Sequence, residues 1–218
     1  MTAAPGSSVI EGLRTLEVRW LVPGQLDAAV AGWFGRFPAE TDSREDTYLV
    51  NPAWCGLSVK VRGGRAFEMK MYHGTVGMLD VRGRARGRIQ SWQKWSFPVG
   101  PLSREGGLSQ DDGAPAGWTV IRKNRRISRF RLARGGIVAG PGRASEPGCA
   151  VELTEVRARD QTWWSLGFEA AGPADLLRNV LEGTAELIFA RALPGGAELG
   201  PGDCRSYAEW LSCTTSHS

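Results

Sequence analysis

Charged and apolar residues alternate strictly over two adjacent stretches of the chain, residues 57–64 and 65–72. Lys60 and Arg62 fall on one face of the first stretch, and Lys70 lies on the polar face of the second. Successive side chains of a β-strand point to opposite sides of the sheet, so each stretch predicts a strand with one ionic and one apolar face. A pair of glycines between them favours a tight turn. The segment therefore predicts an antiparallel hairpin.

The same alternation recurs along the chain and indicates a mainly β protein. Residues 78–88 fit either a strand crowded with arginine or a flexible basic loop. Further strands are predicted at residues 15–22, 46–50, 89–99, 118–123, 127–132, 149–156 and 162–170.

Helices and long loops separate these strands. Apolar residues at helical spacing predict helices over residues 25–36 and 174–192, and a short helix is expected at 207–211. Gly, Pro, Ser and Asp gather in residues 100–116, which predict an exposed loop, and a second loop is expected over 134–148.

About eight amphipathic strands satisfy two architectures: a sandwich with its ionic faces in water, or a closed barrel with its charges inside. Bulky Trp and Phe on the apolar faces favour the barrel, whose exterior is covered. The expected fold class is mainly β (α+β), an eight-stranded antiparallel β tunnel or barrel with helices packed on the outside. One domain is predicted at residues 13–213, between tails at 1–12 and 214–218.

Composition bears on the cellular location of this domain and on the state of its cysteines. No segment of the 218 residues reaches the roughly 20 apolar residues of a membrane span, so no membrane partner is expected. Cys55, Cys149, Cys204 and Cys213 show neither metal-finger spacing nor the density of a disulfide-stabilised protein. With no visible signal peptide, a cytoplasmic location with reduced thiols is expected.

Charge is distributed unevenly. Residues 60–143 hold 18 basic and 5 acidic side chains, whereas the rest of the chain holds 9 basic and 18 acidic ones. A basic middle within an acidic frame indicates an anionic partner or acid–base pairing across the fold. The pattern predicts neither an oligomeric state nor which anion is bound.

Short charged motifs follow one another along the predicted strands. They are Thr15-Leu-Glu-Val-Arg19, Lys60-Val-Arg62, Glu68-Met-Lys70, Lys123-Asn-Arg125, an acidic strand with Glu152 and Glu155, and Gly167-Phe-Glu169. In this order they resemble the CYTH, or triphosphate tunnel metalloenzyme, superfamily over residues 13–192. That superfamily is an eight-stranded antiparallel tunnel that binds triphosphate compounds with a divalent metal. The chain departs from its acidic pattern at Thr15, Lys94, Ser96 and Gly167.

The resemblance implies roles for nine residues and a function. Arginine forks bind phosphate oxygens bidentately and lysine acts as a point charge, while Mg²⁺ or Mn²⁺ takes carboxylate oxygens. The resemblance implies either a binding protein or a metal-dependent phosphohydrolase for a small triphosphate, polyphosphate or nucleotide, with binding the better supported and no catalytic residue assigned. The implied phosphate ligands are Arg19, Lys60, Arg62, Lys70, Lys123 and Arg125; the implied metal ligands are Glu17, Glu152 and Glu169, with Glu68 and Glu155 in reserve.

Two alternatives belong to other classes of function. The missing acids are consistent with a catalytically silent tunnel that senses a phosphorylated ligand or acts as a scaffold. The arginines of residues 82–88, followed by Trp92 and Trp95, are also consistent with binding of single-stranded nucleic acid.

Overall fold

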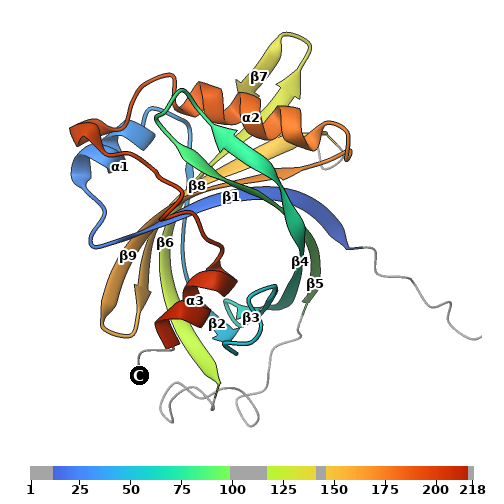
Figure 1. The fold of residues 1–218 in the computed structure, drawn as a ribbon, viewed down its shortest axis with the longest axis vertical. Helices are drawn as coiled ribbons and strands as arrows, with labels where there is room; N and C mark the ends of the chain where they lie inside the picture. Colours follow the sequence, from blue (N-terminus) through green and yellow to red (C-terminus); the bar gives the residue numbers. More distant parts are fainter. Residues whose placement is uncertain (1–11, 99–116, 141–145, 216–218) are drawn as a thin grey trace, which may run out of the picture.

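Eight antiparallel strands close into a barrel in the computed structural model, which describes residues 12–98, 117–140 and 146–215 (Figure 1). The strands neighbour one another in the order β2-β3-β4-β5-β1-β9-β8-β6, and pairing of β2 with β6 completes the ring. The predicted eight-stranded barrel is confirmed. Its strands are β1 (Leu13–Pro23), β2 (Glu40–Leu49), β3 (Leu57–Arg62), β4 (Ala66–Asp80), β5 (Arg86–Pro98), β6 (Trp118–Ala133), β8 (Gly148–Ala158) and β9 (Gln161–Ala171).

Helices pack on the outside of the barrel wall, as predicted. α1 (Ala28–Phe34) begins at Asp27, whose carboxylate accepts a hydrogen bond from the backbone N–H of Ala29. α2 (Leu177–Ile188) covers β1, β8 and β9, and a 3₁₀ turn, η1 (Pro194–Gly196), follows it. Among the described residues, no helix has the length and apolar character needed to cross a membrane.

The alternation of β1 sorts its side chains between two environments. Leu16, Val18 and Trp20 are buried in the main core, which also contains the apolar face of α2. Glu17 and Arg19 line the interior of the barrel. The apolar faces of the strands are therefore covered by helices, and the charged faces point into the lumen. This is the arrangement that a closed barrel with an ionic interior requires.

Residues 118–123 and 127–132 were predicted as two strands, and this prediction is wrong: β6 is one continuous strand of 16 residues. It pairs with β2 on one side and with β8 on the other through the basic run between the two predicted strands. Lys123 and Arg125 within that run point into the lumen and find carboxylate partners there. Pairing on both edges therefore keeps this polar run extended.

Several element boundaries also differ from the predictions. β2 begins six residues earlier than expected, at Glu40, and α2 is shorter than the predicted helix at both ends. β7 (Gly136–Ala139) pairs with β6 outside the barrel, within a predicted loop. The ambiguous residues 78–88 divide between the end of β4, a turn with Arg82 at φ +50°, and the start of β5. The predicted loop at 100–116 lies outside the described residues.

α3 (Tyr207–Thr215) lies across one opening of the barrel (Figure 1). Ser206 and Glu209 form a reciprocal capping box at its start: the Glu209 backbone N–H donates to the Ser206 hydroxyl, and the Ser206 N–H donates to the Glu209 carboxylate. Trp210 is fully buried against lumen-facing Leu21 and Ile121 at that end. The lumen is therefore closed by an aromatic layer on the side of α3.

Candidate functional site

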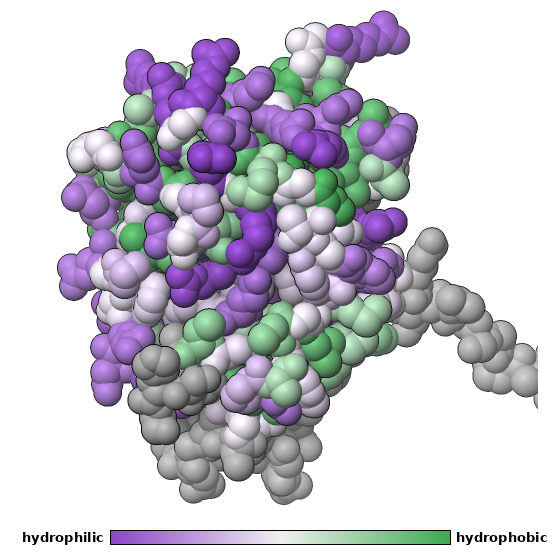
Figure 2. All heavy atoms as spheres, viewed as in Figure 1, coloured by the Kyte–Doolittle hydropathy of each residue, from purple (hydrophilic) through white to green (hydrophobic). Residues whose placement is uncertain are grey.

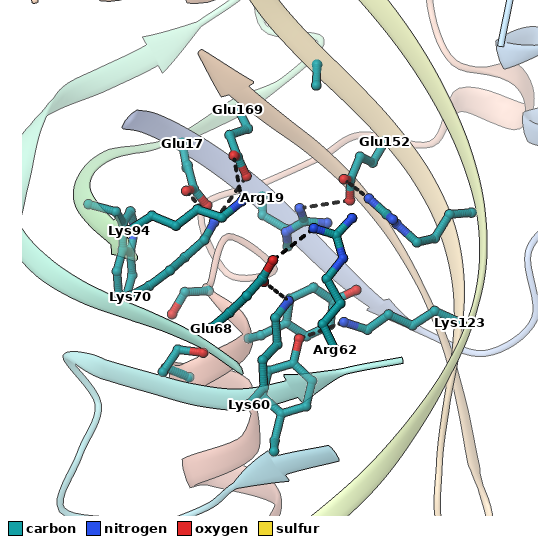
Figure 3. A pocket seen from close by; sticks show the side chains of 18 of the residues that line it. Glu17, Arg19, Lys60, Arg62, Glu68, Lys70, Lys94, Lys123, Glu152 and Glu169 are labelled. Atoms are coloured by element: carbon teal, nitrogen blue, oxygen red, sulfur yellow. Dashed lines mark hydrogen bonds and ion pairs between the residues drawn. The ribbon is translucent and has the colours of Figure 1, made fainter. Parts of the chain in front are cut away.

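The barrel encloses a charged cavity of about 290 Å³ (Figure 3), close to the lower end of small-molecule sites, roughly 300 Å³. All nine residues predicted from the sequence as phosphate or metal ligands line this one cavity. The charged lining residues are Glu17, Arg19, Arg44, Lys60, Arg62, Glu68, Lys70, Lys94, Lys123, Arg125, Arg129, Glu152 and Glu169.

Glu17 and Glu169 face each other across the β1–β9 pair, where they are direct register partners. The Lys70 ammonium, from β4 on another part of the ring, lies 2.6 Å from Glu17 Oε1 and 3.1 Å from Glu169 Oε2. Lys94 approaches Glu169 at 3.6 Å, and the Thr15 hydroxyl donates to Glu17. Like charges directly opposite in a sheet repel each other. The Lys70 ammonium therefore reduces the repulsion between the Glu17 and Glu169 carboxylates.

The protonation states of this group are fixed by their mutual contacts. Burial alone would raise the pKa of Glu169, but Lys70 and Lys94 outweigh it and lower that pKa to about 2. Burial alone would lower the pKa of Lys70, but Glu169 and Glu17 raise it well above its ordinary value. The ammonium and the Glu169 carboxylate are therefore both charged at neutral pH.

Arg19 reaches across β9 to Glu152 on β8. Its guanidinium lies 3.4 Å from Glu152 Oε2 and donates to the Ser165 hydroxyl at 3.2 Å. Arg125 from β6 binds the other carboxylate oxygen of Glu152. Burial would raise the pKa of Glu152, but Arg19 and Arg125 hold it well below its ordinary value. Glu152 is therefore a carboxylate held between two guanidinium groups.

The residue opposite Arg19 on β9 is a glycine, which leaves room for the Arg19 side chain. Gly167 is the register partner of both Arg19 and Glu152. A Cβ at Gly167 would lie 2.5 Å from the Arg19 guanidinium carbon, inside van der Waals contact. An acidic side chain there would occupy the path that Arg19 takes to Glu152, so the absence of a side chain is what permits this ion pair.

Asp46, which the sequence did not identify, is a completely buried acid of the cavity wall. It contacts three cations: Arg44 at 3.0 Å, Lys60 at 3.6 Å and Lys123 at 3.0 Å. Burial alone would raise the pKa of Asp46, but Lys123, Lys60 and Arg44 lower it to about 2. One carboxylate thus serves three positive groups.

Glu68, a reserve metal ligand, is a second buried acid with the same role. It accepts from Lys60 at 3.0 Å and from Arg62 at 2.8 Å. Burial would raise the pKa of Glu68, but Lys60 and Lys94 hold it well below its ordinary value. Arg62 remains 41% exposed toward the open side of the cavity. The other reserve, Glu155, is absent from the cavity lining.

α3 contributes an aromatic contact to the lumen that the sequence did not predict. The Tyr207 ring lies between two cations, with Lys123 Nζ 3.9 Å and the Arg19 guanidinium carbon 4.9 Å from the ring centroid. Lys123 also donates to the Tyr48 hydroxyl at 2.7 Å. Burial would raise the pKa of Tyr207, but Lys123 and Arg19 leave it below its ordinary value. The floor of the cavity is therefore aromatic and bonded to cations.

Positive charge exceeds negative charge in the lumen. Among the described residues, nine cationic side chains line the cavity, against four lining carboxylates and three more, Glu40, Asp42 and Asp46, that are bonded to lining cations. Nine cations against seven carboxylates leave an excess of two positive charges. Burial of uncompensated charge is costly, so this arrangement favours an anion in the cavity.

The local pattern of β2 held the signal for its missed residues. Asp42, Arg44 and Asp46 alternate along one face of that strand. The opposite face carries Ser43 and Glu45 in place of apolar residues, so a search for hydrophobic alternation passes over it. A search for charges spaced by two would have found this face.

The acids of the lumen do not fit a divalent cation. Within the described part of the chain, no three His, Cys, Asp or Glu side chains gather closely enough to hold a metal ion. Glu17 and Glu169 share the Lys70 ammonium, and Glu152 is engaged by two arginines. Metal ligands need lone pairs that converge on one point, and here Lys and Arg groups take those positions.

Three arginines of residues 82–88, Arg84, Arg86 and Arg88, are bonded to other parts of the chain and do not line the cavity. Arg84 donates to two backbone carbonyl oxygens just beyond the end of α2, Arg86 pairs with Asp80 at 3.1 Å, and Arg88 pairs with Glu209 at 3.1 Å. Trp92 is 2% exposed. These arginines therefore take part in contacts within the fold. Figure 2 shows hydrophilic residues near the centre of one face of the molecule.

No protein-family model matches the chain, and no curated protein sequence matches it. Among solved structures, the chain is similar to the PH1819 protein from Pyrococcus horikoshii OT3, with a TM-score of 0.45 and 12% sequence identity. The match covers 91% of this chain and 99% of the other.

Proposed function

We propose that the barrel lumen binds a small polyphosphate compound, such as inorganic triphosphate or the triphosphate group of a nucleotide or coenzyme. The observation that carries this proposal is the excess of two positive charges in one cavity, whose cations come from strands all around the ring. A triphosphate supplies several negative charges within a few ångströms. Its binding would complete a charge balance that the protein alone leaves open.

The chemistry of the lining supports phosphate over other anions. Arg19, Arg44, Arg62 and Arg125 present planar forks suited to two phosphate oxygens at once, and the lysines add point charges. The ordered motifs that resemble the CYTH superfamily come together in this cavity. That resemblance, although the chain lacks several of the acids, supports a triphosphate as the anion.

Binding without turnover fits the lumen better than hydrolysis. Metal-assisted phosphoryl transfer needs a carboxylate that holds a metal or orients the attacking water. Glu17, Glu152 and Glu169 each face a cation instead. We therefore favour a phosphate-ligand sensor or scaffold over a phosphohydrolase.

The lumen is a better anion site than the outer surface. A single nucleic-acid strand would need exposed aromatic residues beside free arginines. Trp92 is buried, and Arg86 and Arg88 already pair with carboxylates of the chain. The enclosed cavity instead suits a small ligand.

A thermal-shift series with orthophosphate, pyrophosphate and tripolyphosphate, each in EDTA, tests the proposal. Stabilisation that rises steeply with chain length of the phosphate is expected, because more charges meet more lumen cations. A parallel phosphate-release assay with Mg²⁺ or Mn²⁺ is expected to show no turnover. Equal shifts with all three phosphates and with sulfate would contradict a specific polyphosphate site, and metal-dependent phosphate release would favour the hydrolase.

A further inference from the structure

The Lys70 ammonium occupies the point between two facing carboxylates. Glu17 and Glu169 are opposed in the β1–β9 register, and Lys70 Nζ contacts an oxygen of each, at 2.6 and 3.1 Å. Figure 3 shows Lys70 entering from β4, with its tip meeting both acids. Facing carboxylates that converge on one cation are also the arrangement that would bind a divalent ion. Here the cation is part of the chain.

We infer that Lys70 takes the place of a divalent metal in this lumen, so that the chain binds its anionic ligand without Mg²⁺ or Mn²⁺. This inference deepens the proposed function and rests on it for the nature of the ligand. Lys70 is a positioning residue: it holds the Glu17–Glu169 pair and keeps that pair from repelling the ligand.

The charge balance of the group supports a structural ammonium. Glu17 and Glu169 together carry two negative charges, and Lys70 and Lys94 carry two positive charges, so the group is neutral. A divalent ion added to this group would meet the Lys70 ammonium within the same contact distance. Repulsion between the two cations at this short separation opposes metal entry.

The remaining excess of positive charge lies elsewhere in the cavity. Arg44, Lys60 and Lys123 share Asp46, and Lys60 and Arg62 share Glu68. The ligand would therefore lie against the cations of β2, β3 and β6, away from the Glu17–Glu169 pair. A metal bound to the phosphates would reduce their charge and weaken their attraction to these cations.

The first experiment uses the unaltered protein. Calorimetric titration with tripolyphosphate in EDTA and again with excess Mg²⁺ is expected to give weaker binding in Mg²⁺, because the metal neutralises ligand charge. Mn²⁺ alone, followed by electron paramagnetic resonance, is expected to keep its free-ion signal in the presence of the protein. Tighter binding of tripolyphosphate in Mg²⁺, or a Mn²⁺ site that is lost in Glu169→Gln, would overturn the inference.

The second experiment uses a gain of metal binding. Lys70→Met removes the ammonium and is expected to bind one Mn²⁺ per chain in the absence of phosphate, and Lys70→Met with Glu169→Gln is expected to lose that site. Lys94→Met is the matched control: it removes the same charge beside Glu169 without clearing the point between the two acids. A folded Lys70→Met that leaves the Mn²⁺ signal unchanged would overturn the inference.

The outcomes separate the inference from the proposed function. Absence of tripolyphosphate binding by the unaltered protein would refute the proposed function, whereas Mn²⁺ binding by Lys70→Met would still establish the role of Lys70. Thermal unfolding of each variant shows whether it is folded. Lys70→Gln, which also removes the ammonium, is expected to bind Mn²⁺ and replaces Lys70→Met if that variant does not fold. Lys70→Arg, which keeps the charge, is expected to bind none.

Discussion

The guanidinium of Arg19 lies directly over Gly167, the register partner of Arg19 on β9. It passes this residue to reach Glu152 on the next strand, 3.4 Å away. Three strands are thereby joined through one side chain, and the bare backbone at Gly167 is the condition for it.

Gly167→Ala tests this relationship. The added Cβ would meet the Arg19 guanidinium at 2.5 Å, so Arg19 must leave Glu152. A loss of about 1.5–3 kcal/mol in the free energy of unfolding is expected, the range for a hydrogen bond to a charged group. Urea denaturation measures it. In an Arg19→Met background the same substitution is expected to cost much less, and equal costs in both backgrounds would show that Arg19 is not the obstacle.

Asp46→Asn tests the sharing of one buried acid by three cations. The substitution keeps the shape of the side chain but leaves Arg44, Lys60 and Lys123 with less compensation. A destabilisation of about 3–5 kcal/mol is expected, as for other buried pairs that lose one partner. Tripolyphosphate is expected to recover part of this loss in a thermal-shift assay. A variant as stable as the parent protein would contradict the role of Asp46.

Stability is expected to fall in acid. The pKa values of Asp46 and Glu169 are lowered to about 2 in the folded protein, from ordinary values of 3.8 and 4.5. A carboxyl with a lowered pKa stabilises the fold above its unfolded pKa, and this contribution disappears as pH falls through the folded pKa. The free energy of unfolding should therefore be steady above about pH 5 and decrease steadily toward pH 2.

Chemical denaturation at a series of pH values measures this dependence. The decrease between pH 5 and pH 2 is expected to be shallower in Asp46→Asn, which lacks one of the two groups. Arg122→Met is a suitable control, because Arg122 is 70% exposed on the outer wall and pairs with Glu45 there. An unchanged acid dependence in Asp46→Asn would show that other groups govern it.

The sequence predicted the barrel because alternation with period two is a local property of each strand. Lys60 and Arg62 share a face whatever the rest of the chain does, so their place on the cavity wall followed once the apolar faces were assigned to the exterior. The same reasoning placed Glu17 and Arg19 inside. Side-chain direction was therefore accessible from the sequence.

Contacts between distant strands were not accessible in this way. Lys70 meets Glu17 and Glu169 across the lumen because the wall curves: β5 lies between β4 and β1, and β5 and β1 lie between β4 and β9. Asp46 was missed because β2 is polar on both faces and shows no hydrophobic period. Which acid meets which cation depends on register and closure, and these are properties of the whole barrel.

Calorimetric titration of the protein with tripolyphosphate in EDTA tests the central claim most directly. One saturable site is expected, weakened in Lys60→Met and unchanged in Arg122→Met, since Lys60 lies inside the lumen and Arg122 outside it. Binding that is absent in the parent protein, or that weakens equally in both variants, would contradict a polyphosphate site in the lumen.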